Sequence, residues 1–245
     1  MKNHAHPPTA NAAANAATNA NAATNANAES AAPVLTSATA LQAMRRAARQ
    51  ARRNLPPAVR RAEAKAAAAA FAQCLRLRAG QHVAFYAPLR EEFPTAELMR
   101  LAWQRGCTVY LPVIAHRRLR VLRFAAVPRP PATPPGRRPL APITMRRNAL
   151  GIEEPATPRH QWRRARELDL IAMPLVAFDA AGHRLGMGGG YYDRALAGTA
   201  GRRPWRLGLA HACQQLPHVP RRAWDMPLDA ILTAEGLRRC HFAQP

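Results

Sequence analysis

The chain has 245 residues, of which 36 are lysine or arginine and 14 are aspartate or glutamate, so its formal net charge is +22. This length is enough for one domain with a full hydrophobic core, with or without a tail. The four cysteines form no CxxC pair and no zinc finger, RNP aromatic pattern or leucine heptad accompanies the arginines, which argues against a zinc site, a disulfide framework and a specific nucleic-acid-binding protein.

Residues 1–36 are dominated by Ala, Asn and Thr, and Lys2 and Glu29 are their only Lys, Arg, Asp or Glu residues. Such a segment has little apolar surface to offset the entropy of ordering, so a disordered tail is predicted before a domain that spans 37–245. The tail lacks the apolar core of a secretory signal and the Arg-rich amphipathic helix of a transit peptide. No apolar run is long enough to cross a bilayer, so a cytoplasmic protein without membrane contact is expected.

Helical periodicity in an Ala- and Arg-rich stretch, interrupted by two prolines, predicts helices over about 38–54 and 58–75. A strand, a helix and a second strand follow in the order of a parallel sheet with a right-handed crossover, over 82–87, 95–105 and 108–113. Further strands are predicted over 119–125, 168–176, 205–210 and 228–233.

Seven prolines within residues 128–142 predict a long surface loop there. No internal repeat is visible. The alternation of strands and helices predicts an α/β fold, a single three-layer domain with a mostly parallel sheet and helices on both faces.

A glycine-rich segment follows the strand predicted over 168–176. Gly186-Met-Gly-Gly-Gly190 leads directly into Tyr191-Tyr-Asp193. Glycines leave backbone N–H groups unshielded by Cβ atoms, so a phosphate can approach them closely. A helix expected over 191–197 adds free N–H groups at its start, and Asp193 offers a hard oxygen ligand for Mg²⁺. We interpret the segment as a nucleotide-phosphate loop, with a plain turn as the alternative, because its spacing fits neither a Walker loop nor GxGxxG.

The run Arg184-Leu-Gly-Met-Gly-Gly-Gly-Tyr-Tyr-Asp-Arg194, preceded by Pro174-Leu-Val-Ala-Phe-Asp179, closely resembles the signature of the 5-formyltetrahydrofolate cyclo-ligase family. Secondary matches lie in the same order at 148–155, 168–171 and 224–229, and the likeness covers roughly residues 38–236. The resemblance implies an enzyme that converts 5-formyltetrahydrofolate to 5,10-methenyltetrahydrofolate while ATP becomes ADP and phosphate. It also implies Mg²⁺ as cofactor and a folate with or without a polyglutamate tail. A monomer is expected.

In the implied mechanism, ATP phosphorylates the formyl oxygen and N10 of the folate closes the ring, with Arg184 and Tyr191 as the catalytic residues. The implied metal ligands are Asp193 and Asp229. The implied ATP-binding residues are Arg45, Arg49, Arg184, Leu185, Gly186, Met187, Gly188, Gly189, Gly190, Tyr191 and Tyr192. The implied folate-binding residues are Ala87, Glu92, Met187, Gly188, Gly189, Gly190 and Tyr191.

Two positions depart from the family pattern. The family's Lys-x-x-Leu-Arg motif has Leu41 at its lysine and Arg45 at its arginine, with Arg49 as a possible substitute contact. Met187 stands where many members carry a basic residue. These departures keep open a catalytically weakened relative that binds folate or a nucleotide, and the charge keeps open a basic nucleic-acid-binding protein that a salt titration would reveal.

Overall fold

A computed structural model of the chain describes residues 38–129, 144–199 and 203–240. The predicted disordered tail lies outside these ranges, as does the predicted proline-rich loop beyond its first two residues. The division into a tail and one enzyme domain therefore stays a prediction. No helix within the described ranges is long and apolar enough to span a membrane.

The four predicted helices are present, each within one residue of its expected bounds. Their bounds are α1 (Ala38–Asn54), α2 (Pro57–Cys74), α3 (Ala96–Gln104) and α4 (Tyr191–Leu196). Two adjacent prolines separate α1 from α2. Pro57 occupies the first turn of α2, where the missing N–H would have no partner in any case, and Pro56 before it stays extended and ends the preceding helix.

A seven-stranded sheet forms the centre of the fold, in the order β11-β10-β9-β6-β1-β2-β3. The bounds are β1 (His82–Ala84), β2 (Thr108–His116), β3 (Val121–Val127), β6 (Leu170–Pro174), β9 (Trp205–Leu209), β10 (Ala230–Thr233) and β11 (Gly236–Arg239). The four central pairings are parallel, and only the two outer pairings, β2 with β3 and β10 with β11, are antiparallel. The prediction of an α/β fold with a mostly parallel sheet is confirmed.

Five short strands were not predicted. They are β11 and two hairpins, β4 (Met145–Arg147) with β5 (Glu153–Pro155) and β7 (Ala177–Phe178) with β8 (Arg184–Leu185). Strands of two to four residues contain too few positions for a period-two pattern to be recognised. The strand predicted over 82–87 ends at Ala84, although Phe85 still donates its N–H to the carbonyl of Tyr110 at 2.9 Å.

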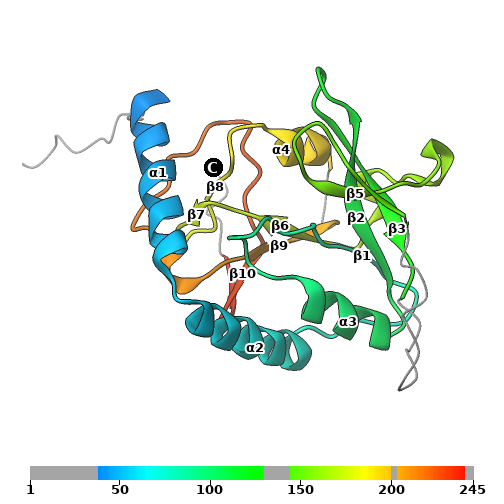
Figure 1. The fold of residues 1–245 in the computed structure, drawn as a ribbon, viewed down its shortest axis with the longest axis horizontal. Coiled ribbons are helices and arrows are strands. Elements are labelled where there is room, and N and C mark those ends of the chain that lie inside the picture. The colour runs from blue at the N-terminus through cyan, green and yellow to red at the C-terminus, as the bar shows by residue number, and fades with distance from the viewer. Residues whose placement is uncertain (1–37, 130–143, 200–202, 241–245) are drawn as a thin grey trace, which may run out of the picture. The chain divides into compact units, whose positions relative to one another are not determined.

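Strand alternation divides the apolar residues between two cores. Val83 and Ala172 face α2 and α3, whereas their neighbours Ala84 and Ile171 face the opposite side, where Leu196 of α4 packs. Figure 1 shows α2 and α3 on one side of the sheet and α4 on the other. The prediction of helices on both faces is confirmed.

The direction of the chain through the sheet reverses between β1 and β6. From β1 the chain passes through α3 to β2 on one side, and from β6 it passes through α4 to β9 on the other. Right-handed crossovers that run in opposite directions place α3 and α4 on opposite faces of the sheet, as observed. Such a switch point leaves a crevice beyond the carboxyl ends of the two strands, which is where ligands bind in open α/β sheets.

Candidate active site

A cavity of about 1000 Å³ lies at this switch point. Tyr86 and Ala87, just after β1, contribute to its wall, as does Pro174 at the end of β6. The whole segment 184–194 lines it, together with Leu41 and Arg45 from α1. The cavity therefore joins the segment that the sequence identified as a phosphate loop to α1 and to the segment after β1.

The glycine loop, residues 186–190, joins the β7–β8 hairpin to α4. Gly188 has φ +92° and Gly190, at the N-cap of α4, has φ +65°, so both positions disfavour a residue with a Cβ. A Cβ at Gly189 would lie 3.0 Å from Cδ2 of Tyr191, so the tyrosine ring lies directly against the loop backbone. The glycines are thus required by the path of the loop and by its contact with Tyr191.

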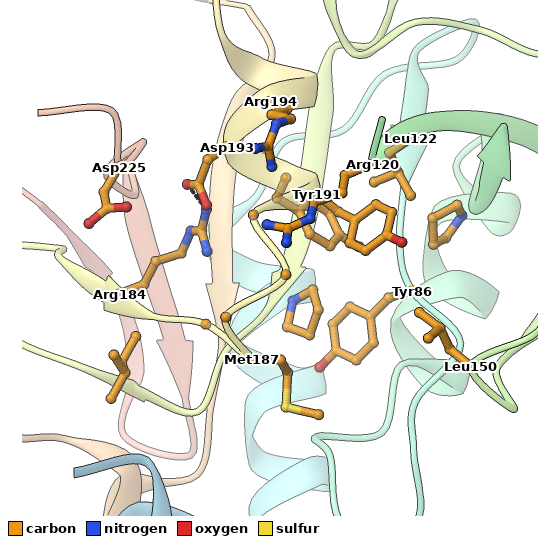
Figure 2. Close-up of a pocket in the computed structure, with 18 of the residues that line it drawn as sticks. Tyr86, Arg120, Leu122, Leu150, Arg184, Met187, Tyr191, Asp193, Arg194 and Asp225 are labelled. Carbon is orange, nitrogen blue, oxygen red and sulfur yellow. Dashed lines mark hydrogen bonds and ion pairs between the residues drawn. The ribbon is translucent and has the colours of Figure 1, made fainter. Parts of the chain in front are cut away.

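Arg184 lies beneath the loop with only 6% of its side chain exposed, and its Nη2 donates to Oδ1 of Asp193 in an ion pair (Figure 2). Its Nε is buried and has no hydrogen-bond partner among the described residues. Burial lowers the pKa of Arg184, while the charges of Asp193 and Asp225 oppose that shift. A buried cation with a free donor at a cavity wall is a site for an anionic ligand.

Two arginines of α1 reach the glycine loop. Nε of Arg45 donates to the carbonyl oxygen of Gly186 at 2.8 Å, and Nη2 of Arg49 lies 3.2 Å from Sδ of Met187. Arg45 lines the cavity, but Arg49 does not. Burial lowers the pKa of Arg45, and the neighbouring charge of Arg222 lowers it further. Of the two arginines left open by the sequence, Arg45 lines the cavity, whereas Arg49 contacts the side chain of Met187 and does not line it.

The segment after β1 forms another part of the cavity wall. Glu92 Oε2 accepts the N–H of Leu89 at 3.0 Å, and burial raises the pKa of the Glu92 carboxyl despite that bond and the charge of Arg52. Tyr86 donates its hydroxyl to the carbonyl of Phe93 at 3.0 Å. The hydroxyl of Tyr192 is buried and has no partner within the described ranges, and burial together with the charge of Glu92 raises the pKa of Tyr192.

The residues that line the cavity differ on the two sides of the glycine loop, although Arg120 lies beside Leu122 on the more apolar side. Figure 2 shows Arg184, Asp193 and Asp225 on one side of the glycine loop, and Tyr86, Leu122 and Leu150 on the other. Charged side chains of both signs line the cavity: Arg45, Arg120, Arg184, Arg194, Arg222, Glu92, Asp193 and Asp225. The excess of arginine favours ligands with several negative charges.

Comparison with known proteins agrees with this arrangement. The 5-formyltetrahydrofolate cyclo-ligase family model matches residues 38–234. The chain belongs to this family. The Escherichia coli K12 5-formyltetrahydrofolate cyclo-ligase is 33% identical over 185 residues, which are 76% of this chain and 95% of the relative. The Haemophilus influenzae enzyme is 37% identical over 158 residues, which are 63% of this chain and 76% of the relative.

Solved structures agree with the family assignment. The NMR structure of the Aquifex aeolicus 5,10-methenyltetrahydrofolate synthetase has a TM-score of 0.65 and 27% identity, covering 84% of this chain and 95% of that one. The structure of the Mycoplasma pneumoniae 5,10-methenyltetrahydrofolate synthetase, at 18% identity and a TM-score of 0.59, shares the fold. The chain is thus an enzyme of the cyclo-ligase family.

Most of the site residues expected for a cyclo-ligase line one cavity: Ala87, Glu92, Arg45, Arg184, Leu185, Gly186, Met187, Gly188, Gly189, Gly190, Tyr191, Tyr192 and Asp193. Leu41, at the family's lysine position, belongs to a buried apolar cluster with Ala48 and Val176 and also lines the cavity, so an apolar wall replaces that charge. Met187 is 51% exposed. Its thioether points toward Arg49, which contributes a positive charge beside the loop.

Asp229, the expected second metal ligand, does not lie with Asp193. It precedes β10, at the amino end of that strand, and its carboxylate accepts Nε and Nη2 of Arg206 at 2.8 and 2.6 Å and the Arg206 N–H at 2.7 Å. The cavity lies at the opposite, carboxyl end of the parallel strands, and Asp229 does not line it. This arrangement makes Asp229 a structural link between β9 and β10.

Asp225 is the carboxylate that the structure brings to the cavity instead. It lies four residues earlier in the same Trp-Asp-Met-Pro-Leu-Asp segment, and the next residue, Met226, donates its N–H to Oδ1 of Asp193 at 3.1 Å. The sequence offered both aspartates within one family match. Spacing alone did not show which one faces the glycine loop.

Proposed function

We propose that this chain performs the reaction of its family: ATP- and Mg²⁺-dependent cyclisation of 5-formyltetrahydrofolate to 5,10-methenyltetrahydrofolate, with release of ADP and phosphate. The observation that carries the proposal is Arg184, buried under the glycine loop with a free Nε, paired with Asp193 in the cavity that also contains Glu92. One wall thus suits phosphates, and the opposite wall suits a flat heterocycle.

The substrates supply both nucleophiles of this reaction, so the protein needs only to position them and to neutralise the phosphate charges. The formyl oxygen attacks the γ-phosphorus and the bond to ADP breaks. N10 then attacks the formyl carbon and loses its proton, and phosphate leaves with the former formyl oxygen. Arg184 and the backbone N–H groups of the glycine loop would hold the transferred phosphoryl group, and Arg45 would add a second positive charge.

The residues present fit a magnesium ion. Mg²⁺ is bound through one or two carboxylates together with substrate phosphates, and Asp193 and Asp225 face the same cavity on either side of Arg184. We assign the two carboxylates as the residues that would hold the ion. Bound there, Mg²⁺ would neutralise the ATP phosphates.

The folate would occupy the side of the cavity that contains Tyr86, Leu122 and Leu150. The Glu92 carboxylate can accept hydrogen bonds from the amino-pyrimidinone edge of a pterin, whose donors sit side by side. The ring of Tyr191, which lies on Gly189, offers a flat surface between the two sides. We also propose that the enzyme is a monomer, that it works in the cytoplasm and that it accepts polyglutamylated folate.

The test is a spectrophotometric assay with the purified full-length chain. 5-Formyltetrahydrofolate and Mg²⁺ are mixed with the protein near neutral pH, and the methenyl-folate absorbance is followed before and after ATP is added. A rise that requires both ATP and Mg²⁺ supports the proposal. Absence of a rise in a folded protein that still binds folate would mean that the chain is a binding relative without cyclase activity.

A further inference from the structure

Trp224 is the most exposed large apolar side chain among the described residues, with 66% of its surface open to solvent. Tryptophan is highly buried on average, so an open indole needs an explanation. The other three tryptophans are half-buried, and two of them, Trp103 and Trp162, donate their indole N–H to backbone carbonyls. Trp224 shows no such bond within the described ranges, and it lines the cavity.

The sequence neighbours of Trp224 place its backbone near the charged residues of the cavity. Trp224 is adjacent in the chain to Asp225 and two residues from Met226, whose N–H binds the carboxylate of Asp193. Two residues of chain span at most about 7 Å, so the backbone of Trp224 lies close to that of Met226, and its side chain lines the same cavity as Asp193 and Asp225. Asp225, the next residue in the chain, lies on the side opposite to Tyr86 and Leu150.

One partner of the indole is already in place. The guanidinium carbon of Arg222 lies 5.6 Å from the centroid of the Trp224 ring, within the range of a cation–π interaction. Arg222 also lines the cavity, and its charge acts on Arg45. An arginine against the indole restrains the ring and leaves an aromatic surface beside the proposed phosphate site.

We infer that Trp224 is a stacking platform for the purine base of the nucleotide. The inference rests on the proposed function, because it takes the triphosphate to lie at Arg45, Arg184 and the glycine loop. A base attached to that triphosphate is the flat aromatic group that can reach this ring, while the folate ring system occupies the side near Glu92. Stacking contacts only the face of the base, so Trp224 adds affinity without reading the edge of the purine.

The test distinguishes the contribution of the base to nucleotide binding from that of the phosphates. In W224A, the KM for ATP should rise by roughly 5- to 100-fold, as expected for loss of one base-stacking contact, while W224F should keep most of the affinity. Inhibition by inorganic tripolyphosphate, which has no base, should be unchanged, and so should the KM for 5-formyltetrahydrofolate. ATP and GTP should be affected by a similar factor.

Intrinsic fluorescence gives a second readout that does not depend on turnover. ADP should quench tryptophan emission in the wild-type protein and in a matched W162F control, whose tryptophan does not line the cavity, but not in W224F. An unchanged KM for ATP in W224A, or a rise in the KM for folate instead, would overturn the inference while leaving the proposed function intact. If neither ATP nor tripolyphosphate binds the wild-type protein, the proposed function fails, and the inference fails with it.

Discussion

Nε of Arg45 donates to the carbonyl oxygen of Gly186 at 2.8 Å and thereby joins α1 to the glycine loop across 141 residues of sequence. The bond orients a guanidinium that lines the cavity and also fixes the first glycine of the loop. One arginine thus combines a structural role with an expected phosphate contact. Among the described residues, no hydrogen bond is found to the other guanidinium nitrogens of Arg45, which can therefore bind a ligand in addition to this bond.

Replacement of Arg45 by methionine should raise the KM for ATP by about 10- to 100-fold, because a charge-assisted hydrogen bond to phosphate and the restraint on Gly186 are both lost. The KM for folate should change little. Steady-state kinetics with each substrate varied in turn provides the measurement. The matched control is R46M on the same helix, where the side chain is exposed and the kinetics should match the wild type. Equal effects of the two substitutions would contradict a specific role for Arg45.

The magnesium assignment predicts that D193N and D225N change the Mg²⁺ requirement of turnover, whereas D229N does not. In the first two variants, the Mg²⁺ concentration for half-maximal turnover should rise by about 10-fold or more, because a carboxylate near the phosphates is removed. In D229N it should stay unchanged, but the free energy of unfolding should fall by about 1–3 kcal/mol, because the bonds from Arg206 are weakened. Magnesium titrations and urea unfolding measure the two effects. A shifted Mg²⁺ requirement in D229N alone would restore the assignment that the sequence suggested.

The raised pKa of Glu92 predicts a pH dependence of folate binding. Only the ionised carboxylate can accept both pterin donors, and burial moves its pKa above the usual 4.5, so protonation begins at a higher pH than for an exposed glutamate. The kcat/KM for 5-formyltetrahydrofolate should therefore fall on the acid side with an apparent pKa above 4.5. In E92Q the value should be low at neutral pH, and this acid limb should be absent. A wild-type acid limb that persists in E92Q would assign the titration to another group.

The short helix after the glycine loop depends on one core side chain. Leu196 is the buried residue of α4, and it packs in the core on that face of the sheet. L196A should lower the free energy of unfolding by about 2–5 kcal/mol, because it removes buried methyl groups and leaves a cavity. The midpoint of urea unfolding measures this loss. L119A makes the same change at a leucine that is 64% exposed, and it should alter stability by less than about 0.5 kcal/mol.

The sequence by itself determined the local parts of this protein. Periodicity and the prolines located the helices within one residue, and the order of strands and helices gave an α/β fold. The density of glycines before Tyr191 predicted a phosphate loop, because close approach to a backbone is a local requirement that glycine meets best. Short strands such as β7 and β8 escaped prediction, since two residues carry no readable period.

Only the tertiary structure decided which distant groups meet. Asp225 and Asp229 are four residues apart in one segment, yet parallel pairing of β9 with β10 directs the amino ends of both strands, and hence Asp229, away from the cavity. The reversal between β1 and β6 brings Glu92, α1 and the glycine loop to the same crevice. Strand direction and handedness of crossover are properties of long-range pairing, and no local pattern of residues encodes them.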